Sequence, residues 1–230
     1  MARNFIKGHC HDPNYFAEVA KKYASNVRIS MEKVAEIYGI STDNVKTSIR
    51  LAIIMYLISY VDCVSIKSKA DDNQQMHYNL GGPKRRTRAS SYYDELFELR
   101  KKNIIKGYTD EEIRHVVDVY LKNPKARNVW EKLGLSKEEM NGVLKKGCIF
   151  GVISDDEFAQ LREVSLSKAR FDGEAAAIKT WLDHVASYRN TRKGILDNIE
   201  KYTREQDKDK LATEQGYLEW FDKEILETIS

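Results

Sequence analysis

Apolar residues recur at three- and four-residue steps through most of the chain, which is the spacing of one buried helix face. In the first such stretch, Asn14 to Ala24, this spacing places Phe16, Val19 and Tyr23 on one side, and Pro13 suits the first turn of a helix. Only three prolines and 12 glycines interrupt the 230 residues, so long helices are favoured over many short strands. The pattern predicts an all-α fold.

Two further helices joined by a tight turn are predicted next in the chain. The first is expected to begin near Ser30, a candidate N-cap, and to end at Gly39, because glycine readily adopts the left-handed conformation that ends a helix. The second is expected to begin at Ser41 or Thr42 and to continue through Leu57, since its later turns are apolar on almost every face.

Part of this region is repeated later in the chain. The segment from 34 to 59 aligns without gaps with the segment from 129 to 154, and seven of the 26 positions are identical. Farther along, Val64–Ile66 and Val164–Leu166 also correspond after a change in spacing. We interpret the segments as two copies of one supersecondary unit, although two amphipathic helix pairs can also resemble each other by chance. The identical pairs are Val34/Val129, Glu36/Glu131, Gly39/Gly134, Ser41/Ser136, Ile54/Ile149, Ile58/Ile153 and Ser59/Ser154.

Helices are also predicted around and after the second copy. A helix from 91 to 102 follows a linker at 80–88, and Thr109 with Glu112 forms a capping box for a helix ending near Leu121. Three more helices are expected, over 174–188, 193–202 and 211–229. The last of these carries leucine or isoleucine at seven-residue steps, which suits packing between helices.

The first copy resembles a helix-turn-helix motif. Such a motif needs a small residue where its helices cross and a tight turn between them. Ala35 is the small residue, Gly39 forms the turn, and Ile40, Val45 and Ile49 are apolar anchors for the second helix. The pattern VAEIYGISTDNV resembles the helix-turn-helix domains of resolvases, simple bacterial repressors and sigma-factor-like proteins. This resemblance covers about 20 residues and indicates a class rather than one family.

The resemblance implies that Ser41 through Arg50 is a recognition helix with its first turns in the DNA major groove. Serine, threonine and a helix N-terminus can hold phosphates, whereas asparagine, lysine and arginine can reach base edges or the backbone. Asp43 is less suitable, because it can accept from a cytosine amino group but cannot contact a phosphate. An ordinary helical hairpin with a solvated polar face is the alternative. The implied DNA-binding residues are Ser41, Thr42, Asn44, Lys46, Thr47 and Arg50.

Basic residues outside this helix extend the predicted interface. The linker contains Lys84, Arg85, Arg86 and Arg88, and a flexible basic arm can follow phosphates or enter a minor groove. A solubilising linker is the alternative interpretation.

The second copy is less suited to DNA binding than the first. Trp130 replaces the small residue, and two carboxylates stand at the start of its second helix. Lys145 and Lys146 offset them only in part. This copy is expected to contact protein, or else to meet DNA through these lysines alone.

The chain is therefore expected to contain two related helix-turn-helix-type units and a C-terminal helical segment. The predicted divisions are 1–79, the basic linker and connecting helix at 80–106, the second unit at 107–172, and 173–230 for oligomerisation or partner binding. From residue 174 onward there are nine Lys and Arg against 12 Asp and Glu, so the basic excess lies before it. Such an excess favours a polyanionic partner.

No arrangement suited to catalysis is recognised, so an enzyme is not expected. His9, Cys10 and His11 are of metal-ligand type but lack a second ligand pair, and neither a metal nor a cofactor is predicted. The three scattered cysteines favour a reducing compartment. No apolar run reaches the ~20 residues that span a bilayer, so the expected location is the cytoplasm, with no membrane partner.

The first functional expectation is sequence-specific binding of double-stranded DNA by a transcriptional regulator, which would bind paired half-sites as a homodimer. The second is a DNA-recognition or assembly subunit of a phage packaging machine, similar to a small terminase, or of a plasmid-partition system. The third is a protein-interaction module that binds no nucleic acid.

Overall fold

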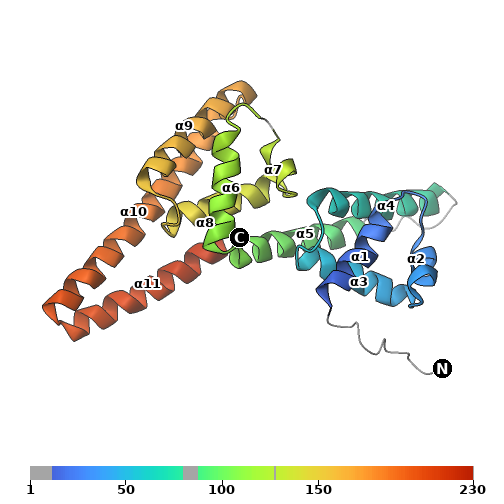
Figure 1. Cartoon of the computed structure of the whole chain (residues 1–230), viewed down its shortest axis with the longest axis horizontal. Coiled ribbons are helices and arrows are strands. Elements are labelled where there is room, and N and C mark those ends of the chain that lie inside the picture. The colour runs from blue at the N-terminus through green and yellow to red at the C-terminus, as the bar shows by residue number, and fades with distance from the viewer. Residues whose placement is uncertain (1–11, 80–87, 127, 230) are drawn as a thin grey trace. The chain divides into compact units, whose positions relative to one another are not determined.

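The computed structural model describes residues 12–79, 88–126 and 128–229, and all regular secondary structure in these ranges is α-helical (Figure 1). The predicted all-α class is confirmed. The chain divides into two compact units, Met1–Ile104 (unit 1) and Ile105–Ser230 (unit 2), with the boundary inside one helix. No helix among the described residues is long and apolar enough to cross a membrane.

Unit 1 is a group of helices around one apolar core. Helix α1 packs against α2, α3 and α4, and side chains from the first part of α5 complete the core. Val19, Ala20, Val34, Val45 and Ile53 are fully buried in it. The helices are α1 (Pro13–Ala24), α2 (Met31–Tyr38), α3 (Thr42–Ile54), α4 (Tyr60–Asn79) and α5 (Arg88–Gly107), the last extending into unit 2.

The turn between α2 and α3 has the caps that the sequence predicts. Ser30 Oγ accepts from the Lys33 amide at 3.2 Å at the start of α2, and Ser41 Oγ accepts from the Asn44 amide at 3.2 Å at the start of α3. Gly39 ends α2 with φ at 63°, in the left-handed region that favours glycine. Two separate helices therefore meet at a tight turn, as expected.

Helix α3 ends earlier than its apolar pattern predicts. It stops at Ile54 rather than Leu57, because Tyr56 turns to a φ of 46° and the Leu57 amide donates to Ala52 O at 3.0 Å. Ser59 then caps α4, and its amide and hydroxyl both donate to the Asp62 carboxylate. The expectation of a continuous helix was wrong because burial of residues near 57 does not require helical backbone.

Unit 2 begins with helices that match the predicted caps. Thr109 and Glu112 form the expected capping box of α6, and Ser154 with Glu157 forms another at α9. The helices are α6 (Asp110–Lys122), α7 (Val129–Lys132), α8 (Lys137–Ile149), α9 (Asp155–Asp172), α10 (Ala175–Glu205) and α11 (Lys208–Ile229).

The C-terminal segment differs from the prediction of three helices. The predicted helices at 174–188 and 193–202 form one helix, α10, because the residues between them include neither glycine nor proline. Helix α11 folds back on α10, and both contact α8. The predicted C-terminal segment is thus packed on the second copy, and its seven-residue pattern contributes buried Ile225 to unit 2.

The aligned segments have closely matching backbones. Helix α8 begins and ends at the positions aligned with the ends of α3. Gly134 has a φ of 67° where Gly39 has 63°, and Gly151 has a φ of 74° where Tyr56 has 46°. The first turn is closed in both copies by equivalent backbone hydrogen bonds, from Ile40 to Ala35 and from Leu135 to Trp130.

The correspondence extends beyond the aligned segments to the last helix of each set. In unit 1, Lys67 of α4 pairs with Asp94 of α5, and in unit 2 Arg162 of α9 pairs with Asp183 of α10. Lys67 and Arg162 occupy equivalent positions when the gap-free alignment is continued. These two ion pairs fit the gap-free alignment, and the sequence match of Val64–Ile66 with Val164–Leu166, which needs a change in spacing, stays a prediction.

An arginine in the same place supports the pairing of α5 with α10. Arg100 Nη1 donates to Ile58 O at 2.6 Å, and Arg189 Nη2 donates to Ile153 O at 2.9 Å. Ile58 and Ile153 are aligned residues, each directly before a serine that caps the next helix. Helices α1–α5 thus correspond in order to α6–α10, with α11 added at the end.

Candidate nucleic-acid interface

Helix α3 has one buried side and one exposed side. Val45, Ile49 and Ala52 are buried at three- and four-residue steps, so the residues between them must face outward. Four exposed residues define what we call the α3 face: Asp43, Lys46, Thr47 and Arg50.

The start of α3 carries the remaining predicted contacts. Ser41 is exposed, whereas Thr42 and Asn44 are half-buried. Ser41 Oγ accepts from the Asn44 amide, which leaves its own proton free to donate to an added acceptor. All six predicted residues of the recognition helix, Ser41, Thr42, Asn44, Lys46, Thr47 and Arg50, lie within three turns of one helix.

The charges on the α3 face are partly balanced. Lys46 Nζ lies 3.3 Å from Asp43 Oδ1. The pKa of Glu32 is lowered by hydrogen bonds from the backbone and from Ser30, and to a smaller extent by the charge of Lys46. Arg50 is exposed and has no hydrogen-bond or ion-pair partner among the described residues. The three-residue spacing of Asp43 and Lys46 is a sequence signal for this pair on a helix. Arg50 is therefore the more available cation.

The equivalent helix in unit 2 has no such face. Lys46 aligns with half-buried Asn141, and Thr47 aligns with Gly142, which is buried. A Cβ added to Gly142 would lie 2.3 Å from Ile105 Cδ1, so the Ile105 side chain already fills the space beside Gly142. Helices α6, α10 and α11 all contact α8. The side of α8 that matches the α3 face is thus partly covered within unit 2, with Gly142 buried and Asn141 and Lys145 half-buried.

The predicted basic residues of the second copy are less exposed than Lys46, and one of them bonds to the backbone. Lys146 Nζ donates to the Lys106 and Tyr108 carbonyls at 2.9 and 2.8 Å, and burial lowers its pKa. Lys145 is half-buried, and burial lowers its pKa as well. Lys146 thus stabilises the entry into α6.

The predicted basic arm is largely outside the described residues. Lys84, Arg85 and Arg86 lie in the segment 80–87, and Arg88 is the first residue of α5.

Charge is unevenly divided between the units. Unit 1 contains 17 Lys and Arg against 11 Asp and Glu, whereas unit 2 contains 21 against 24. The exposed α3 face therefore belongs to the basic unit.

Comparison of the chain with protein-family models, curated proteins and solved structures found no match.

Proposed function

We propose that the protein binds double-stranded DNA in a sequence-specific manner through unit 1, as a transcriptional regulator. The observation that carries this proposal is a short helix behind a tight glycine turn, with Lys46 and Arg50 on its exposed side. Its position in the basic half of the chain adds support, because a net positive unit attracts the phosphate backbone.

The roles of the residues follow from their places on α3. The free amides of the first turn and the Ser41 and Thr42 hydroxyls suit phosphate oxygens. Arg50 and Lys46 suit guanine or phosphate acceptors on the floor and wall of a major groove. Asp43 pairs with Lys46 in the free protein and can accept from a cytosine amino group in the complex.

The test is a salt titration of DNA binding by the Lys46→Ala/Arg50→Ala double variant. We expect affinity for the preferred duplex to fall about 10- to 100-fold, and the slope of log K against log salt to decrease by about 2, because two phosphate or base contacts are lost. Fluorescence anisotropy with a selected duplex measures both quantities.

The control for this experiment removes the same two charges from unit 2. Arg170 and Lys179 are exposed, and we expect Arg170→Ala/Lys179→Ala to bind DNA like the parent protein. Equal losses in the two double variants would contradict a specific role for the α3 face. A parent protein whose affinity for duplex does not change with salt would contradict DNA binding altogether.

A protein-interaction module is the second candidate, and one observation favours it. Part of the side of α8 that matches the α3 face, at Gly142, packs against a residue elsewhere in the same chain. The α3 face could accept a helix of a partner protein in the same way. This candidate predicts that the Lys46→Ala/Arg50→Ala variant loses no affinity for DNA, because the parent protein has none to lose.

A further inference from the structure

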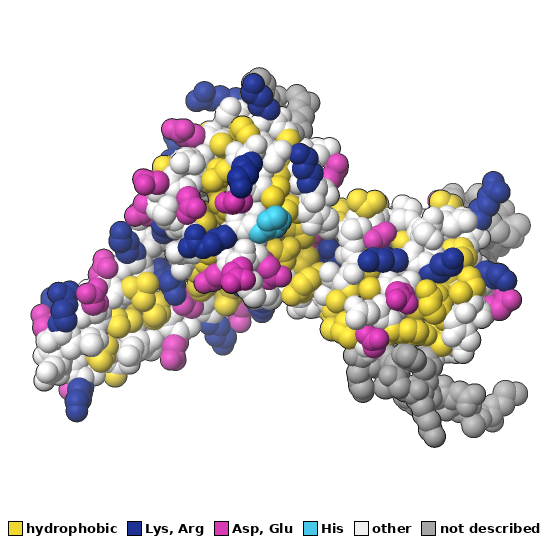
Figure 2. All heavy atoms as spheres, viewed as in Figure 1, with side chains coloured by type: hydrophobic (Ala, Val, Ile, Leu, Met, Phe, Trp, Pro, Cys, Tyr) yellow, Lys and Arg dark blue, Asp and Glu magenta, His cyan; other side chains and the backbone are white. Residues whose placement is uncertain are grey.

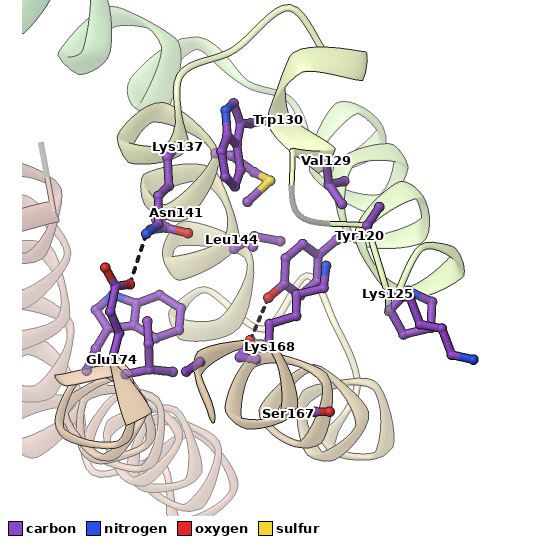
Figure 3. Close-up of a pocket in the computed structure, with 17 residues that line it drawn as sticks. Tyr120, Lys125, Val129, Trp130, Lys137, Asn141, Leu144, Ser167, Lys168 and Glu174 are labelled. Atoms are coloured by element: carbon purple, nitrogen blue, oxygen red, sulfur yellow. Dashed lines mark hydrogen bonds and ion pairs between the residues drawn. The ribbon is translucent and has the colours of Figure 1, made fainter. Parts of the chain in front are cut away.

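Unit 2 contains a cavity of about 560 Å³ that the proposed DNA contact does not use. It lies between α6, α7, α8, α9 and the start of α10 (Figure 3). Trp130, Trp181, Met140 and Leu144 give it an apolar and aromatic lining. The volume and lining are within the range of small-molecule sites.

A buried amine lies in the wall of this cavity. Lys168 Nζ is removed from solvent, and within the described part of the chain no hydrogen-bond acceptor is within reach of it. Figure 3 shows the Lys168 side chain running alongside Tyr120, and Nζ lies 4.0 Å from the centre of that ring. Burial lowers the pKa of Lys168 to about 8. A buried ammonium without an acceptor is costly, so its presence needs an explanation.

Unit 1 also has a lysine beside a tyrosine ring, and this lysine has hydrogen-bond acceptors. Lys69 of α4 lies with Nζ 4.2 Å from the centre of the Tyr23 ring, and Tyr23 and Tyr120 are on corresponding helices. Lys69 Nζ donates to the carbonyls of Tyr23 and Ile29. A lysine beside a tyrosine ring thus occurs in both units, at positions that are not aligned, and among the described residues Lys168 is the one of the two without an acceptor.

Two pairs of polar groups in the cavity wall are formed within the protein. Lys137 Nζ holds Glu174 Oε2 at 3.0 Å, and the Tyr120 hydroxyl bonds with Ser165 Oγ at 2.9 Å. Lys125 also lines the cavity, but Figure 3 shows its side chain pointing away from the other lining residues. Lys168 Nζ is covered in the empty cavity, so a ligand would reach this amine once the Lys168 side chain turns towards the cavity.

We propose that this cavity binds a small carboxylate with an aromatic or branched apolar body, and that the carboxylate accepts a hydrogen bond from the Lys168 ammonium. The apolar body would contact Trp130 and Trp181, while the carboxylate supplies the acceptor that Lys168 lacks. Hydrogen bonds between charged groups are stronger than those between neutral groups. The proposal concerns unit 2 alone and does not depend on what unit 1 binds.

The test compares acids with their primary amides, which have nearly the same shape but no charge. Indole-3-acetate and 4-methylpentanoate are titrated into the full chain by calorimetry, beside indole-3-acetamide and 4-methylpentanamide. We expect at least one acid to bind about tenfold or more tightly than its amide, which is the range for a charged hydrogen bond. In Lys168→Met this preference should disappear while the amide affinity stays within about twofold.

Lys125→Met is the matched control, because it removes a lysine charge from the rim and should keep the preference for the acid. Three results would overturn the proposal: acids and amides that bind the parent protein equally, a preference for acids that survives Lys168→Met, or no binding of either acid at millimolar concentration. Because DNA is absent from these titrations, their failure is distinct from a failure of the proposed DNA binding.

A stability measurement shows that Lys168→Met is folded. The pKa of Lys168 is about 8 in the folded chain and about 10.4 when unfolded, so the unfolded state binds more protons between these values. The parent protein should therefore gain stability as pH rises from about 8 to 10. The variant should show a smaller gain, because Lys145 and Lys146 keep their lowered pKa values, and it should melt at a higher temperature than the parent at pH 7.

Discussion

At the scale of single residues, two glycines are needed for different reasons. Gly39 needs its left-handed backbone, at a φ of 63°, and a Cβ there would meet nothing within 4 Å. Gly142 has no such backbone requirement, but an added Cβ would collide with Ile105. Only the first reason can be inferred from a local sequence pattern, because the second depends on a residue distant in the chain.

We expect Gly39→Ala to lower the free energy of unfolding of unit 1 by about 1–2 kcal/mol, the cost of left-handed backbone for an L-residue. Gly142→Ala should cost unit 2 about 1–3 kcal/mol through overpacking. Denaturant unfolding followed by circular dichroism measures both changes.

Shortening the colliding side chain provides the control. Ile105→Ala is itself destabilising, because Ile105 is fully buried. The double variant should nevertheless lose less stability than the sum of the two single losses, because Ile105→Ala removes the atoms nearest the new Cβ. Gly194→Ala, in open space on α10, should instead stabilise the protein by up to about 1 kcal/mol. If Ile105→Ala and Gly142→Ala were simply additive, the packing explanation would be incorrect.

At the scale of helices, the local signals in the sequence were the reliable ones. The caps at Ser30, Ser41 and Thr109 lie where the residue types placed them, because a cap is made within four residues. The end of α3 and the continuity of α10 were missed, since both depend on how buried residues pack. The match between α5 and α10 also left no clear sequence signal.

Arg100 and Arg189 should be the anchors of these two helices. Arg100→Met leaves the buried Ile58 carbonyl without its charged donor and should destabilise unit 1 by about 1–3 kcal/mol. Arg189→Met should cost unit 2 more, because Arg189 donates to two carbonyls and to Asp155. Urea unfolding measures both losses, and exposed Arg170→Met is the control. A loss in Arg100→Met no larger than in that control would contradict the anchoring role.

At the scale of the whole molecule, the α10–α11 hairpin is the surface we expect to mediate self-association. Tyr217 and Trp220 stack with ring centres 5.5 Å apart, yet remain 46% and 53% exposed. Leu196 of α10 is exposed too, and Figure 2 shows apolar side chains along the hairpin between charged ones. Exposed aromatic residues of this kind are common at protein interfaces.

We expect the protein to be a dimer in solution and Trp220→Arg to shift it towards monomer, as measured by light scattering. Val27→Arg, which places the same charge at an exposed apolar position of unit 1, should leave the mass unchanged. Ring-sized assemblies would favour the packaging or partition role over the regulator. A parent protein that is monomeric at high concentration would rule out both predictions of self-association.

The sequence by itself determined the helices, their caps and the glycine turn before α3, because these depend on neighbouring residues and on apolar spacing. It also indicated that residues 34–59 and 129–154 are related. Only the tertiary structure decided which of the two equivalent helices stays exposed, because α8 is covered by helices that follow it much later in the chain. The cavity beside Lys168 was likewise hidden, since its walls come from residues between Tyr120 and Trp181 that only folding brings together.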